Sequence, residues 1–97
     1  MTAPRWSVDC VTDQRRAIHK AERQREHWDR AVIATVASSR KDRDLTQEEL
    51  AERLGWSREI VSNIEQGRRG VTVSDLILIG RALNIEPDTL FRRILHW

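Results

Sequence analysis

The 97-residue sequence contains few of the residues that bend or cross-link a chain: four glycines, two prolines and one cysteine. The single cysteine, Cys10, excludes an internal disulfide and fits a reducing compartment. No apolar run approaches the roughly 18 residues that a membrane-spanning helix requires. The N-terminal stretch MTAPRWSVDC lacks the apolar core of a signal peptide. We therefore expect a cytoplasmic protein that makes no use of a membrane.

Residues that could perform catalysis or hold a metal are also sparse. His19, His27 and His96 are scattered along the chain, and together with Cys10 they show no metal-ligand spacing. The sequence contains no glycine-rich phosphate loop. We expect a protein that is not an enzyme and that has no cofactor and no metal.

Charge and length set weaker limits. The chain has 17 lysines and arginines against 15 aspartates and glutamates, which gives a net charge of +2. This excess alone indicates only a weak preference for nucleic acid. The length allows one small domain with an extension.

Residues 45–67, LTQEELAERLGWSREIVSNIEQG, predict two short helices joined by a tight turn. Thr46 is a good N-cap, and Glu49 three residues later completes a capping box. The apolar stripe of this first helix consists of Leu50, Ala51 and Leu54. Gly55 then predicts a left-handed stop, and only one residue separates it from Ser57, the N-cap of the next helix.

The second of these helices combines a buried side with a polar outer side. Val61 and Ile64 lie three residues apart and are expected to face a core. The other positions are short, of mixed charge and rich in hydrogen-bonding groups: Ser57, Arg58, Glu59, Ile60, Ser62 and Asn63. Such a face suits contacts with base edges in a major groove.

This stretch resembles the helix-turn-helix of the lambda-repressor-like (XRE/Cro) family of bacterial and phage regulators. The residues that carry the resemblance are Leu45, Thr46, Gln47, Ala51, Gly55, Val61, Ile64, Glu65, Gln66, Gly67 and Arg68. The wider likeness runs from about Ala31 to Ile94. It implies an all-α fold, a five-helix DNA-binding domain that is preceded here by an extra N-terminal helix.

The resemblance also implies a function. Such proteins bind double-stranded DNA sequence-specifically, so we expect a transcriptional regulator that is bacterial or phage-encoded and nucleoid-associated. One unit makes few contacts, and relatives dimerise onto a palindrome with half-sites about one helical turn apart. We expect a repressor that acts as a homodimer. The alternative is a protein-interaction module, such as an antitoxin or scaffold, whose partner would bind the N-terminal helix and the tryptophans Trp6, Trp28 and Trp97.

The expected DNA contacts form two sets. The base-reading set is Ser57, Arg58, Glu59, Ile60, Ser62 and Asn63, and the phosphate-binding set is Gln47, Arg43, Arg68 and Arg69. Arg58 could bind a guanine, Asn63 an adenine and Glu59 a cytosine amine. Ile60 is expected to point outward, toward a thymine methyl. Gln47 would meet a phosphate at the start of its helix.

The resemblance implies an ion pair between two helices, and two residues close to that pair differ from the family pattern. Arg40 and Glu65 match residues that often form a buried ion pair, which would fix orientation more than it stabilises. Ser39 stands where relatives often have leucine, and Asp44 stands where they often have glycine. These departures leave the end of that helix less defined.

The N-terminal third is not covered by the resemblance. We expect a loose tail up to about residue 8 and then a helix, because residues 9–40 contain neither glycine nor proline. Its apolar stripe consists of Val11, Ile18, Ala21, Trp28 and Val32, with Gln14 and Arg25 as interruptions. We assign residues 1–27 to the tail and additional helix, and residues 28–97 to the DNA-binding domain. The helix could lie on the domain, pair with its copy in a dimer, or touch phosphates through its basic side chains.

Two further helices are expected after the motif. Thr72 with Asp75 predicts a capping box, Asn84 a left-handed stop, and Pro87 the first turn of the last helix. The fourth helix is apolar nearly all round, and we expect it at the centre of the core, with these residues inside: Val73, Leu76, Ile77, Leu78, Ile79 and Leu83. The expected dimer interface is the apolar C-terminal face, with the N-terminal helix contributing: Leu90, Phe91, Ile94 and Trp97.

Overall fold

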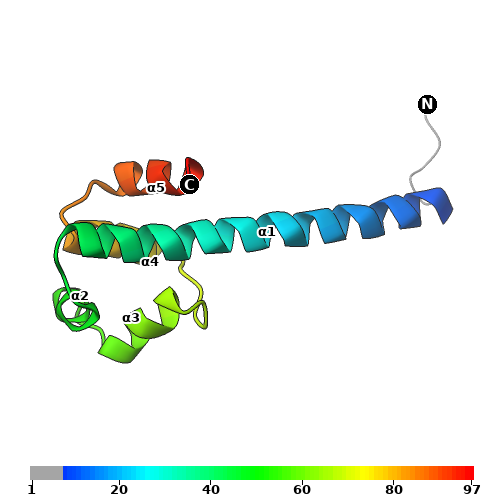
Figure 1. Cartoon of the computed structure of the whole chain (residues 1–97). Helices are drawn as coiled ribbons and strands as arrows, with labels where there is room; N and C mark the ends of the chain where they lie inside the picture. The colour runs from blue at the N-terminus through cyan, green and yellow to red at the C-terminus, as the bar shows by residue number, and fades with distance from the viewer. Residues whose placement is uncertain (1–7) are drawn as a thin grey trace.

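The structure is a computed structural model that describes the backbone of residues 8–97 and the side chains from residue 15 onward. This part of the chain forms five α-helices and no strands, which confirms the all-α class (Figure 1). The helices are α1 (Val8–Asp42), α2 (Gln47–Leu54), α3 (Arg58–Glu65), α4 (Val73–Ala82) and α5 (Pro87–Leu95). None of the described helices is both long and apolar enough to cross a membrane. The expected loose tail, Trp6 and the side chains of Val11 and Gln14 lie outside the described residues.

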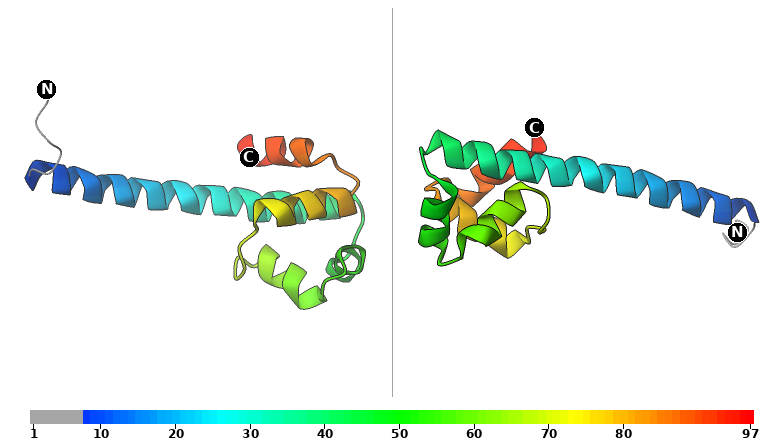
Figure 2. Two further views of the ribbon diagram at one scale, coloured as in Figure 1. Left: turned by 180° about the vertical axis from the view of Figure 1, so that it is seen from behind. Right: turned by 60° about the horizontal axis from the view of Figure 1, so that its bottom comes forward.

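Helix α1 joins the expected extra helix and the first helix of the domain without a break. Its 35 residues run as one rod, and its N-terminal part projects away from the other four helices (Figures 1 and 2). The molecule is accordingly elongated, with extents of 57 × 24 × 20 Å. All side chains of residues 15–30 are exposed. The interpretation that this segment lies on the domain is therefore wrong for most of its length, since only its last residues meet the domain, where His27 lies beside Trp97.

Capping boxes start two of the helices, as the sequence predicts. At α2, the Thr46 hydroxyl accepts from the Glu49 N–H at 3.1 Å, and the Glu49 carboxylate accepts from the Thr46 N–H at 3.2 Å. At α4, Thr72 and Asp75 make the same two bonds, both at 3.1 Å. Each box satisfies two backbone groups that a helix start leaves free.

Left-handed residues follow the first four helices, among them Gly67 with φ 77° after α3. Gly55 has φ 72° after α2, and Asn84 has φ 56° after α4, as expected. Asp44, at the position where relatives often have glycine, has φ 55° after α1. Aspartate tolerates this conformation better than most side chains do, so the chain turns here without a glycine.

The core is shared by all five helices and by the loops that join them. Its buried apolar residues are Val36, Leu45, Leu50, Ala51, Val61, Ile64, Ile79, Leu83, Ile85 and Leu90. Ser39 is fully buried, and its hydroxyl accepts from Arg93 Nη1 at 3.1 Å. This bond ties α1 to α5 at the second position that departs from the family pattern.

The expectation that α4 is buried all round is wrong. Ile79 and Leu83 are buried, but Val73, Ile77 and Leu78 are exposed. Helix α4 packs against α2 and α5. Successive residues of a helix lie about 100° apart, so side chains on its remaining sides stay in solvent.

The expected dimer residues are divided between the core and the surface. Leu90 and Ile94 lie four residues apart on the inner face of α5, and both are buried. Leu90 therefore offers no surface to a partner in this fold, whereas Ile94 lines an apolar groove, and the expected dimer interface stays a prediction. Phe91 and Trp97 remain exposed. Trp97 folds back toward α1, with its ring centroid 5.6 Å from that of His27.

Candidate nucleic-acid interface

Helix α3 is held at the edge of the domain by its inner side chains. Val61 and Ile64 are buried, and the left-handed Gly55 allows the chain to turn directly from α2 into α3. The two helices pack against each other, and α3 lies along the edge of the domain farthest from α5 (Figure 1). The opposite side of α3 is therefore open to solvent.

The outer side of α3 and the following loop enclose a shallow polar hollow of about 340 Å³. It is lined by Arg58, Glu59, Ser62, Asn63, Gln66 and Arg68. Four expected base-reading residues and one expected phosphate-binding arginine thus lie together. Their donors and acceptors match the groups that base edges and phosphates present.

Gln66 is a member of this hollow that the sequence prediction missed. Its side-chain amide donates to the Ser62 hydroxyl at 3.1 Å. The signal was present, because Gln66 lies four residues after Ser62 and so continues the same face. The bond fixes the direction of both side chains.

Ile60 does not have the expected orientation. It is half-buried and packs against the core. Ile60 lies four residues before Ile64, so the two share one face of α3. The expectation that Ile60 points outward is wrong, and a thymine methyl contact does not follow from its position.

Ser57 occupies the N-cap position of α3 but makes no side-chain capping bond. It is exposed at the start of the helix. The free N–H groups of a first turn carry partial positive charge and favour a phosphate oxygen. Ser57 therefore leaves both its hydroxyl and this helix end available to a ligand.

A buried ion pair fixes α3 relative to α1. Arg40 Nε donates to Glu65 Oε2 at 2.8 Å, and Arg40 Nη2 donates to Oε1 at 3.0 Å. Arg40 Nη1 also donates to the Leu45 carbonyl at 2.6 Å, and Gln47 Nε2 donates to Glu65 Oε1 at 3.2 Å. One carboxylate thus connects α1, the start of α2 and the end of α3.

The electrostatics of this network keep Arg40 charged. The hydrogen bonds to Glu65 raise the pKa of Arg40 above its ordinary value, burial opposes that rise, and the negative charge of Glu65 adds to it. Bidentate arginine–carboxylate pairs also constrain direction. The pair that the resemblance implies is therefore present, and it sets the orientation of α3.

The expected phosphate-binding residues are not all beside α3. Arg43 donates to the Asn84 carbonyl at 3.1 Å, in the loop between α4 and α5. Arg69 lies over the Trp56 ring at 5.2 Å and 3.9 Å from the Asp75 carboxylate. Gln47 already donates to Glu65. Of the four, Arg68 alone lines the hollow.

Comparisons with known proteins agree with this architecture. The family described as "Helix-turn-helix" matches residues 36–90. The control protein C.SmaI of Serratia marcescens is 40% identical over 62 residues, which cover 64% of this chain and 74% of that protein. The uncharacterized HTH-type transcriptional regulator y4dJ of Sinorhizobium fredii (strain NBRC 101917 / NGR234) is 39% identical over 54 residues, or 56% of this chain and 70% of that one. The solved structure of the wild-type restriction-modification controller protein C.Esp1396I has a TM-score of 0.67 and 26% identity, and the match covers 71% of this chain and 88% of that chain.

Proposed function

The chain belongs to the lambda-repressor-like helix-turn-helix family and is a DNA-binding transcriptional regulator, and from this premise we propose that it represses transcription as a homodimer on a palindromic operator. The observation that carries the proposal is the polar hollow on α3. Its lining side chains are solvent-facing, chemically mixed and anchored from behind by the buried Arg40–Glu65 pair. A rigid polar helix face at the edge of a domain can enter a major groove.

Within the hollow we assign base contacts to Arg58, Glu59, Ser62 and Asn63. Arg58 is suited to a guanine, Asn63 to an adenine and Glu59 to a cytosine amine. Ser57 is placed at the helix start, where it could meet a base edge or a phosphate. Gln66 reinforces this set through its bond to Ser62.

Phosphate contacts would position the domain around these base contacts. Arg68 is suited to this role because its exposed side chain lines the hollow beside α3. Gln47 and Arg69 lie at the two ends of the motif. Each would bind a phosphate while keeping the side-chain contacts that it makes in this structure. Arg43 would have to leave the Asn84 carbonyl to reach DNA, so its contribution is the smallest.

The proposed homodimer supplies the number of contacts that one domain lacks. The exposed C-terminal residues Phe91 and Trp97 are retained as dimer candidates, and Leu95 between them is exposed as well. Residues 1–27 remain assigned to a separate extension that can contribute to assembly. Repression follows if the bound dimer covers a promoter.

The test begins with selection of bound fragments from a random DNA pool, which gives the operator and its symmetry together. Binding to that operator should weaken steeply as salt rises, with a slope of about −0.9 per phosphate neutralised. A scaffold or antitoxin without DNA function would show little binding at any salt. Repression is then measured with a reporter gene behind the selected operator.

Two variants separate the proposed contacts. Asn63→Ala should lose about 1–3 kcal/mol of discrimination at one base pair. Arg68→Ala should weaken binding to all sequences and reduce the salt slope by about one. Arg81→Ala, an exposed arginine on α4, is the matched control and should change neither. Unchanged affinity and unchanged sequence preference in Asn63→Ala would show that α3 does not dock as proposed.

A further inference from the structure

The projecting part of α1 meets the rest of the described chain only at its last residues, where His27 lies beside Trp97 and Trp28 lines an apolar groove. We call residues 15–30 the arm; every one of its side chains is exposed, including Ile18 at 56% and Trp28 at 40%. Its own side-chain contacts between oppositely polar groups are two solvent-exposed ones at 3.8 Å, His19–Glu22 and the ion pair Glu26–Arg30. Helices in water take most of their stability from packing of one face, and exposed pairs add little. The arm therefore presents a face that another surface can cover.

The apolar positions of the arm lead into a groove on the domain. Ile18, Ala21, Arg25, Trp28 and Val32 are spaced by alternating three and four residues, as on one seam of a coiled coil. Trp28 and Val32, at the domain end of this seam, also line an apolar groove of about 350 Å³.

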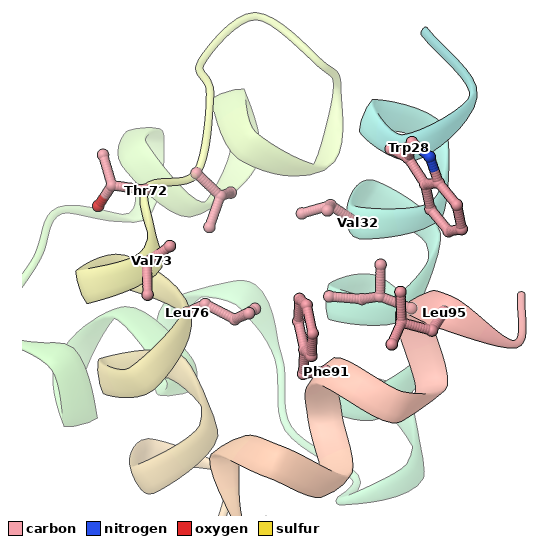
Figure 3. Close-up of a pocket in the computed structure, with 9 residues that line it drawn as sticks. Trp28, Val32, Thr72, Val73, Leu76, Phe91 and Leu95 are labelled. Atoms are coloured by element: carbon pink, nitrogen blue, oxygen red, sulfur yellow. The ribbon is translucent and has the colours of Figure 1, made fainter. Parts of the chain in front are cut away.

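Three helices form the walls of this groove. Figure 3 shows Trp28 and Val32 of α1 on one side and Val73 and Leu76 of α4 on the other. Phe91 of α5 lies between them, and Leu95 of α5 lies on the same side as Trp28. Phe91 and Leu95 are about half exposed, and Val73 is exposed more fully. The seam, which is apolar except at Arg25, thus leads into the groove, so that one surface lies partly on the arm and partly on the domain.

We propose that the arm pairs antiparallel with the arm of a second copy of the chain, so that Ile18 of each copy lies against Trp28 of the other at the mouth of the groove. This proposal rests on the homodimer proposed above and specifies how that homodimer is built. Each arm covers the apolar seam of the other. Each Ile18 also adds an apolar side chain to the edge of the partner groove.

The charges on the arm select this direction. With Ile18 opposite Trp28, Arg25 lies opposite the small side chain of Ala21. The Glu22 carboxylates of the two copies then face each other at the centre of the pair, and the two Arg25 guanidinium groups beside them offset this repulsion. Arg15 and Asp29 then lie near each other across the pair, at both ends. A parallel pair would instead place Arg25 directly against Arg25 of the second copy, which is unfavourable. The interruption of the seam by arginine therefore fits the antiparallel arrangement.

The length of the pair also agrees with DNA geometry. The midpoint of the pairing falls at residue 23, and Ile33 and Val36 inside the domain lie ten and thirteen residues beyond it. At about 1.5 Å per residue, the two domains are then roughly 30–40 Å apart along the arms. Adjacent half-sites on one face of a duplex are about 34–36 Å apart. The paired arms would act as a spacer of the correct length.

Charge exchange in the full-length chain tests the pairing. Arg15→Asp alone should weaken the dimer about tenfold in sedimentation equilibrium, because two like-charged contacts replace two favourable ones. Adding Asp29→Arg should restore the dissociation constant to within about twofold. Arg16→Asp, one residue along and on the other side of the helix, makes the same charge change and should have little effect. Absence of rescue in the double variant would overturn the antiparallel register.

Cysteine cross-linking provides a second test that does not depend on charge. In a Cys10→Ser background, Ile18→Cys combined with Trp28→Cys should give a covalent dimer under mild oxidation, because antiparallel pairing brings these positions within disulfide distance. Ile18→Cys alone should remain monomeric on a non-reducing gel. A covalent dimer from the single variant would mean that the arms pair in parallel and would overturn the proposal.

Operator binding by the same proteins separates this proposal from the proposed function. Suppose that the wild-type chain binds a palindrome as a dimer and that none of the arm variants changes the dissociation constant of the dimer. The arm pairing is then wrong, and the proposed function is unaffected. If the arms cross-link as described but the chain binds no selected DNA, the pairing stands and the proposed function is wrong. A wild-type chain that is strictly monomeric at high micromolar concentration would overturn the arm pairing. The arm would then be a binding surface for a different protein.

Discussion

The two halves of α1 belong to one helix but have opposite surroundings. In residues 31–42 the buried side chains are Ala31, Thr35, Val36, Ser39 and Arg40. In residues 15–30 every side chain is exposed. The same kind of ion pair occurs in both halves: Arg40–Glu65 at 2.8 Å in the core, and Arg30–Glu26 at 3.8 Å in solvent. The comparison shows that helix continuity depends on the absence of glycine and proline, whereas burial depends on which other elements lie beside the helix.

The largest expected difference between the halves concerns their arginines. Arg40→Ala leaves Glu65 buried without its counter-charge and should destabilise the domain by about 3–5 kcal/mol. Urea unfolding followed by circular dichroism measures this change. The matched substitution in the arm, Arg23→Ala, should change the free energy of unfolding by less than about 0.5 kcal/mol. Equal effects of the two substitutions would remove the distinction between the halves.

Substitutions of apolar residues should show the same contrast between the halves, with smaller changes in the free energy of unfolding. Val36 is 1% exposed, so Val36→Ala should lower the free energy of unfolding by about 2 kcal/mol through lost burial and a small cavity. Ile18→Ala should change it by less than about 0.5 kcal/mol at protein concentrations where the chain is monomeric. A large loss from Ile18→Ala under those conditions would mean that the arm packs on its own domain.

A substitution at the junction between the halves should change the free energy of unfolding by an intermediate amount. Trp28 is 40% exposed and makes an edge contact with His27, with ring centroids 4.8 Å apart. Trp28→Ala should therefore lower the stability of the monomer by about 1 kcal/mol. Thermal unfolding at several concentrations checks this, because a contribution from dimerisation depends on concentration. A loss as large as that of Arg40→Ala would contradict the partial exposure of Trp28.

The smallest effect is expected from the ion pair in the arm. Both partners of Glu26–Arg30 are about 70% exposed, so Glu26→Gln should change stability by at most about 0.5 kcal/mol. High salt should reduce the difference further. Urea unfolding at low and high salt provides the measurement, and a salt-independent loss above about 1 kcal/mol would argue against a solvated arm.

Much of the fold could be predicted because its signals are local. The capping boxes at Thr46 and Thr72 and the stops at Gly55 and Asn84 depend on residues within one turn of each other. The Arg40–Glu65 pair could be anticipated only through the family resemblance, since its partners are 25 positions apart. The hollow on α3 followed from the polar residues of a single helix.

The errors arose where burial depends on neighbouring elements. Phe91 and Leu90 are both apolar and adjacent, yet the packing of α5 against α1 and α4 leaves one outside and the other inside. The same applies to Ile77 and Ile79 on α4. Ile60 is different, because its four-residue spacing from Ile64 already indicated the inner face. The continuity of α1 could not be decided from sequence, since no residue near position 28 signals a helix end.

An unbroken α1 has a mechanical consequence for regulation. Arg40 near its C-terminal end binds Glu65 at the end of α3, so α1 and α3 are expected to move together. Tilting the N-terminal end of α1 would therefore also move α3, because the helix between them has no hinge.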